Sequence, residues 1–351
     1  MTAVVPATVQ PRVIVSASLA FDYIMTFPGA LADHILPDKV HTISVSFLVE
    51  TLRRQRGGVA GNIAYSLALL GERPTLVGAG GSDFAAYRAA FLGLGIDMAA
   101  VLDVEEELTA SAFMISDLRA SQVMAFYPGA SKRAAEFSVS ALAAEARVGL
   151  VGATTLEAMR RHTAELAEAG CPVIYDPSQQ LVALPAEDIL AGVERAWAVV
   201  GNDYEYAMIE RKTGLTVDQL SARVPLVVIT YGGQGSELRY HGEAVSIPVA
   251  PTTDLVDPTG SGDAYRAGLI KGLLLGFELA VVGRLAALAA TFALERHGPQ
   301  EHVYSAESFV ARFDRAFPDY TGAISPDALR HEADASRWLP PRVLTSSPIG
   351  G

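Results

Sequence analysis

Asp257-Pro258-Thr259-Gly260-Ser261-Gly262-Asp263 is the most informative stretch of this chain, and it leads directly into the helix-like segment 264–270. Its glycines, hydroxyl and final carboxylate stand where a loop becomes a helix. The first amides of a helix have no intrahelical acceptor and carry a partial positive charge, so anions bind there. A carboxylate in that turn can act as a general base beside the anion. The stretch is typical of phosphoryl transfer to a hydroxyl, although a simple capped helix start looks the same in isolation.

The composition of the 351 residues is that of a globular protein, with 50% hydrophobic and 19% charged residues. Lys and Arg number 27 against 39 Asp and Glu, a net charge of −12, which argues against nucleic-acid or anionic-membrane binding. The longest apolar stretch, 279–294, is too short to span a bilayer, and residues 1–11 lack a signal-peptide pattern. We therefore expect a cytoplasmic protein. The single cysteine, Cys171, excludes an internal disulfide and is expected to be a small buried residue.

Short apolar runs alternate with helical patterns along most of the chain. Strands are expected at 13–17, 76–79, 150–152, 173–175, 198–200 and 226–230, and helices at 61–70, 83–94, 156–169, 262–276 and 279–295. This alternation predicts an α/β fold with a mainly parallel sheet that is covered by helices on both faces.

Two further regions do not suit a buried parallel sheet. Residues 41–49 alternate between apolar and polar side chains, and 110–116 with 122–127 are typical of a hairpin about 117–119. We expect these regions, within about 22–49 and 108–128, to form a small β-sheet lid on one domain of residues 12–320. Residues 321–351 would be a partly irregular C-terminal extension.

A glycine-rich segment, Gly57-Gly58-Val59-Ala60-Gly61-Asn62, precedes the first expected helix. Glycines let a ligand approach the backbone closely, and an Asn amide can both donate and accept hydrogen bonds, so a polyhydroxylated ligand would fit. A tight loop capped by Asn62 is the alternative. Asp22 follows the first strand, where α/β proteins place ligand contacts, and its carboxylate suits two adjacent sugar hydroxyls.

Polar or glycine-rich segments also follow two later strands. Asn202-Asp203-Tyr204-Glu205 suits a hydrated Mg²⁺, which prefers oxygen ligands, but it also has the form of a helix cap. Thr230-Tyr231-Gly232-Gly233-Gln234-Gly235 could accept a nucleotide or be a plain glycine turn.

Two other segments superficially resemble ligand sites. Gly78-Ala79-Gly80-Gly81-Ser82-Asp83 has Asp83 in place of the third glycine of a dinucleotide fingerprint, so we do not expect such a site there. His297-Gly298-Pro299-Gln300-Glu301-His302 lacks the ligand spacing of a transition-metal site and is expected to be a loop near the nucleotide.

Taken together, these segments resemble the phosphofructokinase-B, or ribokinase-like, family of carbohydrate and nucleoside kinases. Residues 257–263 resemble the family's Asp-Thr-x-Gly-Ala-Gly-Asp segment, 57–62 its amino-terminal glycine signature, and Asn202 with Glu205 its Asn-x-x-Glu motif. The resemblance extends over roughly 12–317 and implies a three-layer α/β/α sandwich with a β-sheet lid.

The resemblance also implies a role for each matching position. Asp263 would be the catalytic base, and Gly260, Ser261 and Gly262 would form the anion hole. Ser261 replaces the family's usual Ala, which keeps the backbone N–H and adds a hydroxyl. The other implied sites are Asn202 and Glu205 for Mg²⁺ held through water, Thr230, Gly232 and Gly235 for ATP, Asp22, Gly57, Gly58 and Asn62 for substrate hydroxyls, Asp257 and Thr259 for a monovalent cation such as K⁺, and Gly298 for the cation and adenine region.

Within this family the chain looks most like prokaryotic adenosine and nucleoside kinases, which implies ATP-dependent phosphorylation of a nucleoside 5′-hydroxyl, with adenosine as the expected acceptor. The lid would then place apolar side chains over the base, with Phe113, Met114 and Phe126 as candidates, unless these serve lid or dimer packing. A ribokinase-like sugar kinase is the alternative, and a non-catalytic nucleoside- or sugar-binding regulator is a third possibility. An exposed lid also suggests a homodimer formed through it.

Overall fold

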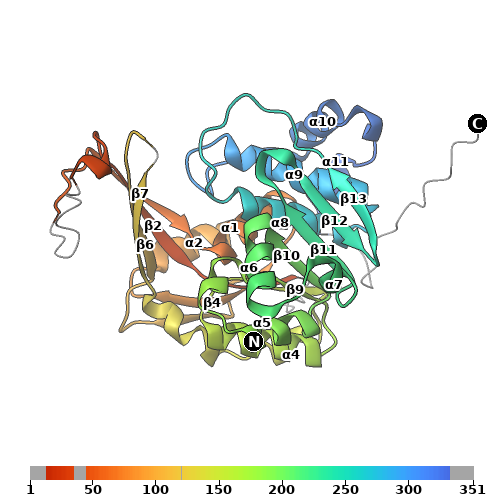
Figure 1. The fold of residues 1–351 in the computed structure, drawn as a ribbon, viewed down its shortest axis with the longest axis horizontal. Coiled ribbons are helices and arrows are strands. Elements are labelled where there is room, and N and C mark those ends of the chain that lie inside the picture. Colours follow the sequence, from red (N-terminus) through yellow and green to blue (C-terminus); the bar gives the residue numbers. More distant parts are fainter. Residues whose placement is uncertain (1–12, 35–44, 120, 333–351) are drawn as a thin grey trace, which may run out of the picture.

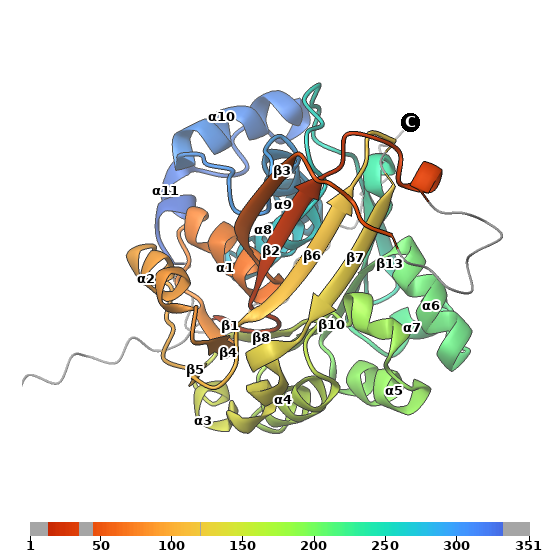
Figure 2. The same ribbon diagram turned by 90° about the vertical axis from the view of Figure 1, so that its left-hand side faces the viewer.

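Two β-sheets organise the chain in the computed structural model, which describes residues 13–34, 45–119 and 121–332. The larger has nine strands in the order β13-β12-β11-β10-β9-β8-β1-β4-β5, and the smaller has four in the order β3-β2-β6-β7. Figure 1 shows the smaller sheet standing to one side of the main body, and Figure 2 shows its four strands face-on. The expected α/β fold with a small β-sheet lid is therefore confirmed.

The central sheet is parallel from β5 to β11, whereas β12 runs in the opposite direction and pairs antiparallel with both β11 and β13. Its strands are β1 Val13–Ser16, β4 Thr75–Gly81, β5 Val101–Val104, β8 Val148–Val151, β9 Val173–Tyr175, β10 Ala198–Asn202, β11 Leu226–Thr230, β12 Ser236–Tyr240 and β13 Glu243–Ile247. The parallel strands β1, β4, β8 and β9 are buried along their whole length, which is why they are continuous apolar runs without alternation.

Helices cover both faces of this sheet and form two separate cores. One face carries α1 Val59–Leu69, α2 Ala85–Gly93, α8 Ser261–Leu274, α9 Leu279–Leu294, α10 Ala306–Ala316 and α11 Pro326–Arg330. The other carries α3 Ser140–Ala143, α4 Leu156–Glu168, α5 Ala186–Arg195, α6 Asp203–Thr213 and α7 Val217–Ser221. Short 3₁₀ segments are η1 Leu31–His34, η3 Gly129–Glu136, η4 Ser178–Val182, η5 Gly232–Gln234 and η6 Pro318–Tyr320.

The lid consists of β2 Ala20–Thr26, β3 Thr51–Gly57, β6 Ala110–Ser116 and β7 Gln122–Tyr127. The predicted hairpin of β6 and β7 is confirmed with its bounds unchanged. The strand predicted at 41–49 is wrong in its described part, because residues 45–49 form no strand and the chain pairs with β2 only from Thr51 onward. Residues 41–44 lie outside the described range.

Close packing of α8 against α9 fixes the helix that begins at Ser261. A Cβ added at Gly268 would lie 2.6 Å from the Cα of Ala286, and one at Gly272 would lie 3.0 Å from the Cα of Val282. Glycine at these two positions therefore lets the two backbones approach each other, and it holds the first turn of α8 in place.

Candidate active site

The first turn of α8 is open to an anion. Gly260 caps the helix with a left-handed φ of 78°, and a Cβ there would lie 2.4 Å from the Cβ of Pro299, so glycine is required. Among the described residues, no acceptor lies within hydrogen-bonding distance of the amides of Gly262 and Asp263. The amide of Ser261 instead donates to the carbonyl of Pro258 at 3.2 Å. Of the three residues that the resemblance places in the anion hole, Gly260, Ser261 and Gly262, Ser261 thus has an internal partner for its amide, whereas the amides of Gly262 and Asp263 are available to an anion.

The hydroxyl of Ser261 also has a local partner. Its Oγ donates to the carbonyl oxygen of Pro258 at 2.7 Å, beside the bond from its own amide. The serine that replaces the family's usual alanine thus closes the turn before α8.

Asp263 has the environment of a general base. Its Oδ2 accepts a hydrogen bond from Asn62 Nδ2 at 2.8 Å, which brings the glycine-rich segment and the α8 segment together as expected. Burial raises the pKa of the Asp263 carboxyl to about 7, against the opposing effects of the Arg266 charge and the Asn62 hydrogen bond. A carboxylate with this pKa can take a proton near neutral pH.

Asp22 lies on the lid strand β2 and touches the glycine-rich segment. A Cβ at Gly57 would lie 2.1 Å from Asp22 Oδ2, so the carboxylate occupies the space that glycine leaves. Gly58 has a φ of 85° and packs against the carbonyl of Ser18, and thus shapes the turn rather than offering a side chain. Burial and, secondly, the charge of Asp257 raise the pKa of Asp22 to about 6. Asp22 thus adjoins the glycine-rich segment, and the negative charge of Asp257 acts on it.

Asp257 joins the α8 segment to the loop after α9. Its Oδ1 accepts from the amide of Thr259 at 2.9 Å, and its Oδ2 accepts from the amide of Gly298 at 3.0 Å. Gly298 has a φ of 103°, and a Cβ there would lie 2.5 Å from Gln55 Oε1 on β3. Gly298 therefore lies between Asp257 and the lid. The monovalent cation that the resemblance implies at Asp257 and Thr259 stays a prediction.

Asn202 and Glu205 form a capping box at the start of α6. Asn202 Oδ1 accepts from the Glu205 amide and Glu205 Oε2 from the Asn202 amide, both at 2.8 Å. Burial raises the pKa of Glu205, with a second contribution from the charge of Asp176. Each side chain is an oxygen donor with lone pairs beyond those used in the cap, so the pair fits a magnesium ion held through water. Capping and metal contact are compatible here.

The residues predicted to line the nucleotide, Thr230, Gly232 and Gly235, border the same edge of the sheet as Asn202. Thr230 pairs with Asn202 in the ladder of β10 and β11. Gly232 opens η5 with a φ of 55° and has open space around it, whereas a Cβ at Gly235 would lie 2.1 Å from the carbonyl oxygen of Ile247. Ser236 Oγ lies 2.7 Å from the hydroxyl of Tyr265, which ties this edge to α8.

The structure separates the three apolar lid candidates. Residues opposite each other in a β-ladder share a face, and Asp22, Ala112 and Phe126 are in register across β2, β6 and β7. Met114 lies two residues from Ala112 and shares that inner face, with Asp22. Phe113 is in register with Tyr23 on the outer face, where their rings stack at 4.8 Å. The structure does not bring Phe113 together with Asp22, because strand alternation turns it away.

Sequence reasoning missed three side chains around Asp263. Arg266, one turn further along α8, pairs with the buried Asp176 through both guanidinium Nε and Nη2. The same guanidinium lies 4.0 Å from Glu205, so it connects the base to the capping pair. Gln300 donates to Asn62 Oδ1 at 3.0 Å. A carboxylate directly after a buried strand could have pointed to Asp176, but nothing in the pattern singled out Gln300.

Three further findings concern Cys171, His302 and the apolar helices. Cys171 is buried, and burial raises the pKa of its thiol to about 12, as expected of a structural residue. His302 is buried beside Ser66, with Nε2 and Oγ 3.1 Å apart, and no cluster of three or more metal-ligating side chains occurs in the part of the chain that the structure describes. Within those same residues, no helix combines the length and apolarity needed to cross a membrane.

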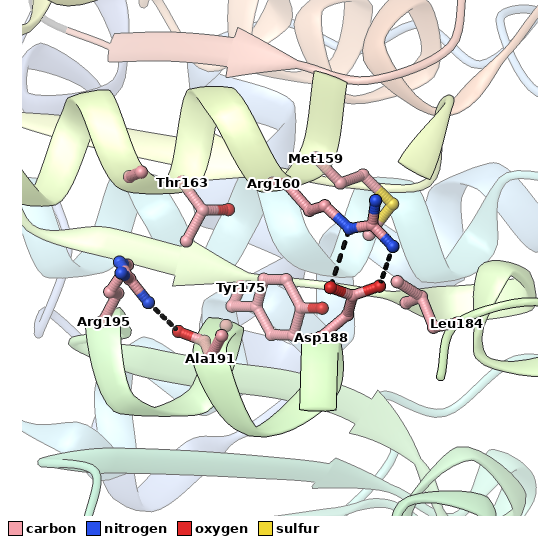
Figure 3. Close-up of a pocket in the computed structure, with 10 residues that line it drawn as sticks. Met159, Arg160, Thr163, Tyr175, Leu184, Asp188, Ala191 and Arg195 are labelled. Carbon is pink, nitrogen blue, oxygen red and sulfur yellow. Dashed lines mark hydrogen bonds and ion pairs between the residues drawn. The ribbon is translucent and has the colours of Figure 1, made fainter. Parts of the chain in front are cut away.

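A separate cavity of about 230 Å³ lies between α4 and α5, away from every predicted site residue. Figure 3 shows the ion pair of Arg160 with Asp188 at one end, and Arg195 donating to the carbonyl of Ala191 at the other. Tyr175 lies between them. None of the residues that line this cavity belongs to the segments predicted to form the site.

Comparisons with known proteins show the family to which the chain belongs. The sequence pattern described as pfkB family carbohydrate kinase matches residues 22–305. A nucleoside kinase of Methanothermobacter thermautotrophicus is 32% identical over 300 residues, which cover 84% of this chain and 93% of the relative. A nucleoside kinase of Methanocaldococcus jannaschii is 27% identical over 274 residues, covering 78% and 90%. The structure of Burkholderia thailandensis nucleoside kinase in complex with inosine aligns with a TM-score of 0.79 at 35% identity, covering 87% of this chain and 98% of that one.

Proposed function

Since this chain belongs to the pfkB family of carbohydrate kinases, we propose that it transfers the γ-phosphoryl group of ATP to the 5′-hydroxyl of a nucleoside. Family membership makes it a phosphotransferase with an alcohol group as acceptor. The nucleoside acceptor is supported by two nucleoside kinases that are 32% and 35% identical to the chain over most of its length. Adenosine is the acceptor that we expect, and inosine is the natural comparison because the Burkholderia enzyme was solved with it.

One observation carries this proposal: the Asn62–Asp263 contact of 2.8 Å at the open end of α8. Asp263 takes the proton of the acceptor hydroxyl as its oxygen bonds to the γ-phosphorus and the bond from that phosphorus to the ADP oxygen breaks. The free amides of Gly262 and Asp263 stabilise the charge on the transferred group. Positioning and charge stabilisation supply most of the catalysis in such reactions.

The nucleotide would lie along the carboxyl ends of β10 and β11, with Thr230, Gly232 and Gly235 around it. Asn202 and Glu205 would hold Mg²⁺ through water, and the ion would offset the phosphate charge that a protein of net charge −12 otherwise repels. K⁺ beside Asp257 and Thr259 belongs to the same proposal.

The acceptor would lie between the lid and α8. Asp22 accepts hydrogen bonds from two ribose hydroxyls, and Asn62 can donate its second amide hydrogen to the sugar. Phe126 and Met114, on the inner face of the lid, would cover the base. Gly57 leaves the space that the Asp22 carboxylate occupies, and Gly58 shapes the turn beside it.

The variant Asp263→Asn tests the base assignment, because Asn keeps the side-chain shape and can accept the Asn62 hydrogen bond but cannot take a proton. We expect kcat for nucleoside phosphorylation to fall by about 10² or more. Turnover within a few-fold of the unmodified protein would show that another group is the base.

The outer face of the lid favours a homodimer as part of this proposal. Leu52, Met25, Ile115 and Val123 lie in register across all four lid strands, and Leu52 and Val123 are 63% and 48% exposed. Such an apolar row on a sheet with free edges is a pairing surface. Light scattering should give twice the mass of one chain, and Val123→Glu should lower it to one. A monomeric unmodified protein would contradict the dimer.

A further inference from the structure

A chain of hydrogen bonds from four separate elements ends on the proposed base. Arg56 on β3 donates through Nε to Gln300 Oε1 at 3.2 Å. Gln300, in the loop after α9, donates through Nε2 to Asn62 Oδ1 at 3.0 Å. Asn62 on α1 donates through Nδ2 to Asp263 Oδ2 at 2.8 Å. The lid strand and the catalytic helix are thereby connected through two buried amides.

Arg56 fixes the donor-to-acceptor direction of this row of hydrogen bonds. A guanidinium can only donate, so Gln300 must turn Oε1 toward Arg56 and Nε2 toward Asn62. The contact with Tyr87 requires the same orientation: its hydroxyl donates to the carbonyl of Gly57 at 2.9 Å and accepts from Gln300 Nε2 at 3.3 Å. Both hydrogens of Gln300 Nε2 are then used, so its partners determine a single orientation of the Gln300 amide.

The three side chains in these hydrogen bonds are buried, which strengthens the effect of their orientation. Gln300 is 4% exposed, Asn62 5% and Tyr87 1%, so water does not compete for their hydrogen bonds. With its Oδ1 occupied by Gln300, Asn62 can offer only Nδ2 to Asp263. The acceptor that fits Nδ2 is an unprotonated carboxylate oxygen. Oδ2 of Asp263 is thereby occupied, while Oδ1 has no hydrogen-bond partner among the described residues.

We propose that Gln300 is a positioning residue of the phosphoryl-transfer reaction. It fixes the Asn62 amide so that Asp263 is held as a hydrogen-bond acceptor through Oδ2 and receives the substrate proton on Oδ1. Through Arg56 it also links this arrangement to the position of the lid. The inference rests on the proposed function, because it concerns the same base and the same reaction.

The test compares Gln300→Glu with Gln300→Leu by steady-state kinetics and pH profiles. In Gln300→Glu the new carboxylate cannot donate to Asn62 Oδ1, so the Asn62 amide turns over and presents Oδ1 to Asp263, which then must hold a proton to bond with it. We expect kcat to fall by about 10² or more, and the acid limb of the profile to move to higher pH. The other charged groups facing Asp263 are Arg266 on α8, Asp176 after β9 and Asp22 on β2, and they are unchanged.

Gln300→Leu removes the fixed orientation without reversing it, so we expect a smaller fall in kcat, about tenfold, and an acid limb that stays in place. The KM for ATP should change little in both variants. Gln219→Glu is the matched control, because Gln219 Oε1 caps α7 by accepting from the Thr216 amide at 3.0 Å, and a carboxylate preserves that bond. Its kinetics should equal those of the unmodified protein.

Arg56→Met keeps the test decisive if Gln300→Glu fails to fold, because Arg56 is only half-buried. It removes the donor to Gln300 Oε1 and leaves only the contacts of Nε2 with Asn62 and Tyr87 to orient the amide, so kcat should fall several-fold without loss of folding. Unmodified protein that phosphorylates no nucleoside would overturn the proposed function itself. Active unmodified protein whose folded Gln300 or Arg56 variants keep kcat within about twofold, with no shift of the acid limb, would overturn the role of Gln300.

Discussion

At the scale of single residues, the proposed reaction depends on the protonation state of Asp263. Burial raises its pKa to about 7, and the pKa of Asp22 to about 6. Both groups act as acceptors when ionised, so protonation of either lowers activity. The two shifts therefore act in the same direction.

The pH dependence of kcat/KM follows from these values. A carboxyl whose pKa is raised holds its proton up to higher pH, so activity should be low in acid, rise through about pH 7 and level off above it. The variant Asp22→Asn removes the ionisation of Asp22. The rise of kcat/KM near pH 7, which we assign to Asp263, should remain in that variant. Initial rates measured between about pH 5.5 and 8.5 check this. A profile that is flat over this range would contradict the assignment of Asp263 as the base.

At the scale of secondary structure, α8 was the most predictable element. The change from a glycine-rich loop to an apolar helix occurs within one continuous stretch of sequence. The contacts of α8 with other elements were harder to predict from the sequence. Asn62 is 201 positions away in sequence from Asp263, and only the resemblance to a known family placed both at one site. The hydrogen bond between them depends on how α1 and α8 pack.

The lid strand β3 shows why other elements escaped prediction. Its sequence, Thr51-Leu52-Arg53-Arg54-Gln55-Arg56-Gly57, carries three arginines and no apolar alternation. It is a strand because its backbone pairs with β2, and no local sequence pattern predicts this tertiary contact. The alternating residues before it, 45–49, have no such partner strand. In both segments, 45–49 and 51–57, the presence or absence of a partner strand had more influence than the local strand propensity.

The contact between α8 and α9 gives a prediction at this scale. Gly268→Ala places a methyl group against the backbone of Ala286, so the helices must separate, and we expect a loss of roughly 1–3 kcal/mol in the free energy of unfolding. Because α8 carries Asp263, kcat should fall as well. Urea unfolding and initial rates measure the two effects.

Gly93→Ala is the control for that variant. Gly93 ends α2, and a Cβ there would meet no atom within 4 Å. The substitution should leave stability unchanged or raise it by up to about 1 kcal/mol, since it restricts only the unfolded chain. Equal stability of the two variants would show that the α8–α9 contact is not tight.

At the scale of the whole molecule, the alternation of strands and helices was enough to predict the layered architecture, and the two cores on opposite faces of the sheet confirm it. The antiparallel pair β12 and β13 was missed, because short strands of mixed polarity resemble loops. Gln300 was missed for a different reason. Its importance comes from three partners on three other elements, Arg56, Tyr87 and Asn62, and these meet only in the folded chain.

The proposed choice of acceptor likewise depends on the assembled molecule, because the proposed acceptor site takes residues from the lid, α1 and α8. The most direct measurement of the central claim is ATP-dependent product formation with adenosine, inosine, cytidine, ribose and fructose as acceptors, each at matched concentration. We predict 5′-monophosphate from the nucleosides, with adenosine the best acceptor, and kcat/KM values well above those for the free sugars. Phosphorylation of ribose or fructose with none of any nucleoside would contradict the account and identify the chain as a sugar kinase.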